Sequence, residues 1–457
     1  MTEIDATTQR ILTHVGNVAP RETFPTLDEL NAFARELAAE FPTAVVLKTI
    51  GYSVGGEPLH SLTIGSGRRR VLVVGNPHPD EPIGLATIQH LADRLVRDAS
   101  FLFESDATWH FVLCIDPDGT KLNEGWYTGP VTRANVARHF YRPPLSAQAE
   151  WTFPMLHHGT VVGEPTPETV ALMGLIDDVR PELVASLHNA NFGGGFFYVS
   201  GGEPEYWDGL TRLLERFGIE KEGGLPDLPG ARTFAPAVFE LTSFAATIEA
   251  LASDAGEVLL AGGSTYDYAA RHGAEGLIVE LPLWTDPRGA DLSSSGQSLR
   301  AVMRSSALAL KANASVIRGV LERLSGEVNN ASVFYPALVD SLELLLETVA
   351  DRLHDDSPES LRDATKAEQF MEAISLPDTL RLRAGGLLMR LLGECEPTPV
   401  VRRELDNFSL VFESWLDEIE ADRPGTPVPI ADLVSVQAAA VVLGVAQVPA
   451  NGHAHTY

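Results

Sequence analysis

The chain has 457 residues, of which 44% are hydrophobic, and its formal net charge is −28. This composition is typical of a globular protein and excludes a disordered or membrane-embedded chain. The negative charge argues against a nucleic-acid partner, because phosphate binding requires clusters of Lys and Arg. The length predicts one domain of about 300 residues and a second unit.

The amino-terminal segment is polar and lacks the basic-then-apolar pattern of a secretory signal, so we expect a cytoplasmic location. The longest apolar run, from Leu433 to Val445, contains Ser435 and Gln437 and is too short to cross a bilayer. We therefore expect no membrane partner.

The first 300 residues alternate between helical and strand patterns. Apolar residues recur at helical spacing over residues 26–41, and alternating residues around Gly55-Gly56 predict a β-hairpin. The uninterrupted apolar run at 71–76 predicts a strand buried on both faces, and a helical pattern follows at 83–96. Further strands are expected at 110–115, 183–187, 196–200 and 276–281, with helices between them. We predict an α/β fold: a mixed, mostly parallel sheet with helices on both faces.

The pattern changes after about residue 297, where strand-like runs end. Long amphipathic helices are expected at 300–324, 337–353, 380–392 and 401–419, and one more apolar helix follows the Pro-rich link at 424–429. We therefore divide the chain into a predicted catalytic domain, residues 1–300, and a helical carboxy-terminal domain, residues 301–457. The helical domain could serve as a lid, or as the contact of a homo-oligomer.

Three of the predicted strands end in residues that bind metals or transfer protons. His78 and Glu81 follow the strand at 71–76, and His188 follows the strand at 183–187. Imidazole and carboxylate are the ligands of catalytic zinc sites, which keep one position open for water. Glu280 lies in the apolar strand at 276–281, where an unpaired charge would cost several kcal/mol, and a role as general base explains it. Ligands in open α/β sheets bind at these carboxyl ends.

These residues resemble the zinc metallocarboxypeptidase family of carboxypeptidases A and B over roughly residues 26 to 300. Supporting motifs are Gly262-Gly263-Ser264, sixteen positions before Glu280, the turn Asp116-Pro117-Asp118-Gly119, and the pattern that opens at Gly51. The resemblance implies one Zn²⁺ per chain, held by His78, Glu81 and His188, with Glu280 as the general base.

The resemblance also implies residues that contact the substrate. Arg138 would bind a substrate carboxylate, Thr265 would lie in the specificity pocket, and Asn189 would line the site beside His188. Asn135 takes the position of an acid that orients the first zinc histidine. The arginine that stabilises the oxyanion has no clear match, so Arg133, which we assign to this catalytic role, competes with Arg138 and Arg142.

Two departures from the family pattern affect substrate recognition. Ala137 replaces the Asn before the carboxylate-binding Arg, and Val258 stands where the family has a mobile Tyr. We predict a zinc-dependent metallocarboxypeptidase that hydrolyses the carboxy-terminal peptide bond of a peptide. The alternatives are a zinc amidohydrolase that deacylates a small N-acyl amino acid, and a catalytically silent zinc-containing binding protein.

Overall fold

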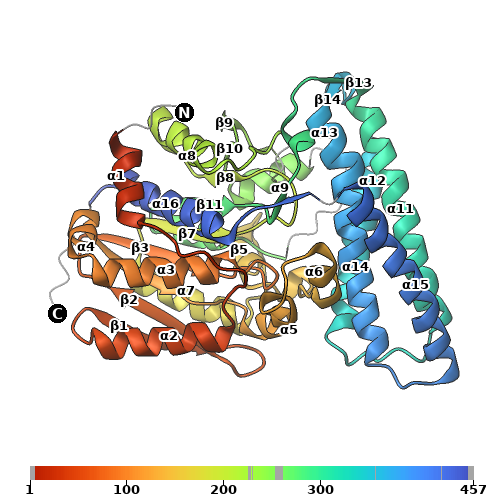
Figure 1. Cartoon of the computed structure of the whole chain (residues 1–457), viewed down its shortest axis with the longest axis horizontal. Helices are drawn as coiled ribbons and strands as arrows, with labels where there is room; N and C mark the ends of the chain where they lie inside the picture. The colour runs from red at the N-terminus through yellow and green to blue at the C-terminus, as the bar shows by residue number, and fades with distance from the viewer. Residues whose placement is uncertain are drawn as a thin grey trace.

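The computed structural model describes residues 6–224, 228, 230–252, 261–355, 357–423 and 425–450. A large sheet with helices on both faces forms one side of the molecule, and a bundle of long helices stands beside it (Figure 1). The predicted α/β class, with a helical carboxy-terminal region, is therefore confirmed. Val258 and the terminal histidines His453 and His455 lie outside the described residues.

The nine-stranded sheet is mixed, and its parallel pairs lie at the centre. The strand order is β1-β2-β4-β3-β7-β11-β8-β10-β9, and the run β4-β3-β7-β11 is parallel throughout. The bounds are β1 Val45–Tyr52, β2 Pro58–Ile64, β3 Arg69–Gly75, β4 Ala107–Val112, β7 Leu183–His188, β8 Phe196–Val199, β9 Thr233–Ala235, β10 Val238–Glu240 and β11 Glu275–Glu280. β1 and β2 form the predicted hairpin.

The centre of the sheet is buried on both faces, and residues 71–74 of β3 are apolar at every position. In β3, Val71 and Val73 face one core, whereas Leu72 and Val74 face another. The first core includes side chains of α1 (Ala6–Val15), α2 (Leu27–Glu40), α3 (Ile83–Arg97), α8 (Pro204–Phe217) and α16 (Ile430–Gln447). The second includes those of α7 (Pro167–Val179) and α10 (Thr265–Ala270).

Four long helices form a separate unit with its own core, here called the helical unit. They are α11 (Leu299–Arg323), α12 (Phe334–His354), α14 (Leu376–Gly393) and α15 (Pro399–Asp422). α14 packs against the short helix α6 (Arg133–His139), and Ala137 and Phe140 from that region join the core of the helical unit. The bundle therefore contacts, through α6, the part of the molecule that contains the large sheet, here called the first unit.

Shorter elements connect these parts. They are α4 (Ala99–Ser105), α5 (Pro117–Tyr127), β5 (Met155–His157), β6 (Thr160–Val162), α9 (Phe244–Ala252), β12 (Trp284–Thr285), β13 (Ser294–Ser298), β14 (Asp363–Thr365), α13 (Lys366–Phe370) and β15 (Thr426–Pro427). A π-helical turn at Met371–Ser375 joins α13 to α14, so the helix predicted at 380–392 begins at Leu376.

The last helix, α16, returns to the sheet and packs against α3 and α8 (Figure 1). The apolar run at 433–445, predicted to be too short for a membrane span, belongs to this helix of 18 residues, which is long and apolar enough to cross a membrane, with a mean hydropathy of 1.7. However, 78% of the helix is buried inside the molecule. Burial in the core accounts for its apolar sequence. A division by hydrophobic core therefore groups α16 with the sheet, whereas the sequence groups it with the helices after residue 300. The boundary at residue 300 itself stays a prediction.

Candidate metal centre

His78 and Glu81 lie in the loop between β3 and α3, and side chains from α5 fix its shape. The chain leaves β3 at Asn76, whose left-handed backbone (φ 52°) turns it sharply, and Asn76 donates a hydrogen bond to Thr120 at 2.6 Å. The buried Tyr127 hydroxyl donates to the carbonyl oxygen of Pro79. The loop is therefore held before α3 begins at Ile83.

His188 and Glu280 end two adjacent parallel strands. β7 and β11 pair so that His188 stands directly opposite Glu280, and side chains at paired positions point to the same face of a sheet. The Nδ1 atom of His188 lies 3.8 Å from Oε1 of Glu280. The register of one strand pair thus places the predicted base beside a predicted ligand.

The structure brings His78, Glu81 and His188 together. One nitrogen or oxygen atom of each lies within 4.8 Å of those of the others, and all three side chains are buried. Nδ1 of His78 is 3.0 Å from Oε1 of Glu81, and Nδ1 of His188 is 2.9 Å from Oε2. Two imidazole nitrogens and a carboxylate thus converge on one point.

The charges of this cluster are strongly coupled. Burial and the charge of Arg142 lower the pKa of His78 to about 4. Burial opposes the charged form of His188, but the hydrogen bond and the charge of Glu81 outweigh it and raise the pKa to about 9. Burial likewise opposes ionisation of Glu81, yet both histidines and Arg142 hold its pKa well below the usual range. The carboxylate of Glu81 is therefore anionic.

Behind His188 lies a chain of hydrogen bonds that could orient its ring. Its Nε2 atom is 3.1 Å from Oγ of Ser186, and Ser186 faces the buried Glu150 at 3.4 Å. Thr265 donates to the same Glu150 oxygen at 2.9 Å. Metal-binding histidines usually donate their second ring N–H to such a partner. Thr265, predicted to line the specificity pocket, is fully buried in this network.

α16 supports the same strand end from the other side. The fully buried Gln437 donates from Nε2 to the carbonyl oxygen of His188 at 3.0 Å, and its Oε1 accepts from Thr87 of α3 at 2.7 Å. Helix α16 therefore contacts the backbone of a predicted metal ligand.

Two arginines meet the cluster at Asp80. Arg142 makes a two-point contact with Asp80, at 2.7 and 3.1 Å, and also pairs with Glu81. Arg383, from α14 of the helical unit, reaches Asp80 at 3.4 Å. Asp80 is completely buried, so its charge requires these partners. The helical unit thus supplies a cation next to the cluster.

The other predicted residues occupy different surroundings. Arg138 pairs with Glu413 of α15 at 2.6 Å, and both side chains are nearly half exposed. Arg133 donates to the carbonyl oxygen of Arg423 at 2.9 Å and stacks on Phe192. The carboxylate and oxyanion roles assigned to Arg138 and Arg133 stay predictions, and the arginine that touches the cluster is Arg142.

Of the two asparagines that the sequence analysis selected, Asn189 adjoins the metal-binding cluster and Asn135 does not contact His78. The backbone N–H of Asn189 lies 3.3 Å from Oε2 of Glu81, so Asn189 adjoins the cluster. The side chain of Asn135 instead bonds to the carbonyl oxygen of Pro130 at 3.0 Å. His78 receives its hydrogen bond at Nε2 from the indole N–H of Trp151, at 3.1 Å. The side chain that contacts Nε2 of His78 is therefore Trp151, whereas Asn135 bonds elsewhere.

Sequence reasoning missed Glu150, Trp151, Arg383 and Gln437. Glu150 and Trp151 lie in a short 3₁₀ turn without periodicity, and Arg383 and Gln437 lie about 200 residues or more beyond His188 on helices. A hint was available for Gln437, since it is a polar residue within the apolar run 433–445.

The donor set fits a zinc ion. Two histidines and one glutamate form a frequent catalytic zinc set, and the three atoms already converge. Ser186 can accept the second ring proton of His188, as a metal held at Nδ1 requires. The Trp151 indole can only donate, so a metal at Nδ1 of His78 requires this indole to turn away from Nε2.

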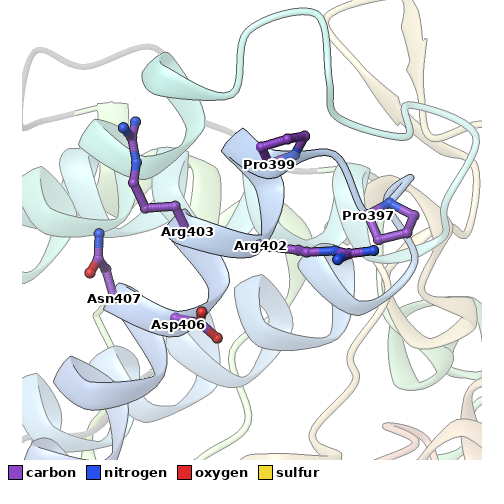
Figure 2. A pocket seen from close by; sticks show the side chains of 6 residues that line it. All are labelled: Pro397, Pro399, Arg402, Arg403, Asp406 and Asn407. Atoms are coloured by element: carbon purple, nitrogen blue, oxygen red, sulfur yellow. The ribbon is translucent and has the colours of Figure 1, made fainter.

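A hollow of about 540 Å³ lies at the beginning of α15 and is lined by Pro397, Pro399, Arg402, Arg403, Asp406 and Asn407 (Figure 2). In Figure 2, Arg403 points away from Arg402 and Pro397. The other end of α15 leads to Arg423, which contacts Arg133. At a rise of about 1.5 Å per residue, Asn407 is roughly 24 Å from that end. This hollow is therefore remote from the contact between Arg423 and Arg133.

Comparison with solved structures finds several carboxypeptidases at low similarity. The metallo-carboxypeptidase from Burkholderia cenocepacia is 17% identical, with a TM-score of 0.34, and the match covers 56% of this chain and 60% of that one. Carboxypeptidase A from Helicoverpa armigera is 16% identical, with a TM-score of 0.38, covering 61% and 71%. The murein-tripeptide amidase MpaA from Escherichia coli O157 is 18% identical, with a TM-score of 0.26, covering 52% and 83%.

The sequence itself gives a more specific match. Residues 30–210 match the family model of zinc carboxypeptidases. This segment contains His78, Glu81 and His188, whereas Glu280 and the helical unit lie beyond it. The match confirms that the chain resembles the zinc carboxypeptidase family, and that the resemblance includes the segment with all three predicted metal ligands.

Proposed function

We propose that this protein is a zinc-dependent metallocarboxypeptidase that hydrolyses the carboxy-terminal peptide bond of a peptide or peptide-like substrate. The convergence of His78, Glu81 and His188, with Glu280 beside them, carries the proposal. The match of residues 30–210 to zinc carboxypeptidases supports the hydrolase class.

The residues of the chain divide the chemical work among them. Zinc, when bound, polarises the scissile carbonyl and lowers the pKa of water to about 7. The Glu280 carboxylate accepts the proton of the attacking water and then passes it to the leaving amine. Glu280 is only 19% exposed, which limits competition from bulk solvent. Of Arg133, Arg138 and Arg142, Arg142 is the one that pairs with Glu81, so we assign to it the stabilisation of the developing oxyanion.

A zinc amidohydrolase that acts on a small N-acyl amino acid is the second candidate. The ion pair that Arg138 forms with Glu413 favours it, because that arginine then does not serve as a carboxylate reader. A catalytically silent zinc-binding protein is the third, and the retention of Glu280 beside His188 argues against it. Cytoplasmic location and assembly through the helical domain stay predictions.

Hydrolysis of a matched substrate panel tests the proposal. The panel pairs peptides that have a free carboxy terminus with their carboxy-amidated forms, and adds N-acyl amino acids. We expect cleavage of the free peptides and a loss of at least 100-fold in kcat for Glu280→Gln, with zinc content unchanged. Full activity of Glu280→Gln would refute the mechanism, and preference for N-acyl amino acids would favour the second candidate. His188→Ala should lose the stoichiometric zinc.

A further inference from the structure

Helix α11 exposes a face that follows a seven-residue repeat. The residues of this face alternate in steps of four and three, and all of them are exposed: Ala301, Ser305, Leu308, Ala312 and Ser315. Leu308, the largest of them, is 64% exposed. This spacing places side chains in one line along a helix and is the spacing by which helices pack on each other. The other side chains of the face are small, so a further helix can approach it closely.

A row of cations borders this face. Arg304, Lys311 and Arg318 are seven residues apart, and all three are exposed. Among the described residues, Arg304 and Lys311 have no carboxylate within salt-bridge distance, and Arg318 has only Glu322, at 4.0 Å. The chain has 34 Lys and Arg against 62 Asp and Glu, so a row of cations without such partners is exceptional in it. Charges beside a helix-packing face select the helix that packs there, and these select an acidic one.

The neighbouring helix α12 has the opposite charge on its exposed side. Glu343, Glu347 and Asp351 are four residues apart and exposed, and within the described ranges no cation lies within salt-bridge distance of them. Burial and the charges of Asp351, Glu343 and Asp340 raise the pKa of Glu347, so these carboxylates repel one another. A row of cations placed against α12 would remove this repulsion.

Helices α11 and α12 are antiparallel and share one outer surface. Arg300, at the start of α11, donates a hydrogen bond to the carbonyl oxygen of Ser357, just beyond the end of α12, at 3.1 Å. Both helices pack against α14 as well as against each other, so their sides away from α14 form one surface. Figure 1 shows α11 at the edge of the helical unit farthest from the sheet. The first unit therefore leaves α11 accessible to another molecule.

The charges select one arrangement of two copies on this surface. A two-fold axis across the helices would place α11 on α11, and like charges would meet. A two-fold axis parallel to the helices places α11 of each copy on α12 of the other and keeps every residue at its height along the axis. Measured from the level of Arg300 and Ser357 at about 1.5 Å per residue, Lys311 is at about 17 Å and Glu347 at about 15 Å. The two rows of opposite charge then meet.

The surface is also large enough for a specific dimer. The shorter helix, α12, has 21 residues and is about 31 Å long. Packed helices are about 8–10 Å apart, so the two helices present about 600 Å² on each copy. Two copies would bury about 1,200 Å² in total, which is the lower end of the range for specific interfaces.

We propose that this protein forms a two-fold homodimer in which α11 of each copy packs on α12 of the other. Lys311 pairs with Glu347 of the second copy, and Arg304 pairs with Asp351 of the second copy. Because a two-fold axis repeats each contact, the dimer contains both pairs twice. The inference goes beyond the proposed hydrolase function and does not depend on it.

Sedimentation equilibrium of the full chain tests the proposal. At about 50 μM protein, which exceeds the micromolar dissociation constants of weak interfaces, we expect twice the chain mass of 49.3 kDa. Raising NaCl from about 0.05 M to about 0.5 M should weaken the dimer, because exposed charges are screened. Lys311→Glu and Glu347→Lys should each weaken it at least about tenfold. Arg402→Glu, at an exposed arginine of α15, is the matched control and should leave it unchanged.

An equal mixture of Lys311→Glu and Glu347→Lys is the decisive sample. In a mixed dimer opposite charges meet across both copies of the contact, whereas within each variant chain the two positions carry the same charge. The mixture should therefore dimerise as the wild type does. Failure of the mixture to dimerise would overturn the proposal, and so would a wild-type mass of one chain or a dimer that Lys311→Glu leaves unchanged. Thermal unfolding of each variant separates dissociation from misfolding. No step of this test measures hydrolysis, so failure of the hydrolase assay leaves its result intact.

Discussion

Gly386 allows α14 to touch α6 so closely that any side chain there must separate the two helices. A Cβ atom at this position would lie 1.9 Å from the carbonyl oxygen of Ala137, and real Cβ atoms essentially never approach closer than 3.0 Å. Gly386→Ala therefore forces a separation of at least 1.1 Å (3.0 − 1.9). The obstacle is backbone, so no side-chain rotation relieves it.

The expected loss is about 1–3 kcal/mol of unfolding free energy, as for overpacked cores. Gly393→Ala is the matched control: Gly393 ends the same helix, and nothing lies within 4 Å of its Cβ position. Alanine there should stabilise the helix by up to about 1 kcal/mol. Urea denaturation followed by circular dichroism measures both variants. The close-contact argument is refuted if both variants unfold at the same urea concentration.

The remaining predictions concern the pH dependence of stability at Asp116 and the hydrogen bond from Gln437 to His188. Burial, with the nearby carboxylates of Glu168 and Asp118, raises the pKa of the half-buried Asp116 to about 7, so the folded state binds this proton more tightly than the unfolded state. The ionised Asp116 carboxylate therefore destabilises the folded protein, fully above pH 7 and no longer as the pH falls toward 4. Asp116→Asn should raise the unfolding free energy by about 1–2 kcal/mol at pH 8 and by much less at pH 4.5. Equal gains in thermal unfolding at both pH values would contradict this prediction. Gln437→Met removes the hydrogen bond to the His188 carbonyl and should cost about 1–3 kcal/mol of stability and weaken zinc affinity roughly tenfold. Gln297→Met, at an exposed position of β13, is the control. Unchanged zinc affinity in a competition titration would show that Gln437 does not position His188.

The sequence predicted the strands and their functional ends because buried central strands leave an uninterrupted apolar pattern. His78, Glu81, His188 and Glu280 each stand at or just after such a strand, and parallel strand ends meet at one edge of a sheet. Three of these four then proved to form a compact cluster, and the fourth lies beside it.

Contacts between distant segments left no such pattern. Arg383 lies on a helix whose apolar face is buried against the bundle core, so no periodicity marks it as a neighbour of Asp80. Arg138 had the spacing expected of a carboxylate reader, yet Glu413, which is 275 residues further along the chain, pairs with it. The docking of the helical unit places Glu413 beside Arg138 and Arg383 beside Asp80.

The return of α16 to the sheet has a consequence for synthesis on the ribosome. β12 and β15 pair at Trp284 and Pro427, so the helical unit is looped out between two neighbouring strands whose ends stay together. Domains form from the amino terminus as the chain emerges, but one face of the sheet lacks α16 until residue 447 has been made. The nascent chain must therefore keep this apolar surface from aggregating while the helical unit folds. Proteins truncated before residue 430 should retain this exposed surface permanently.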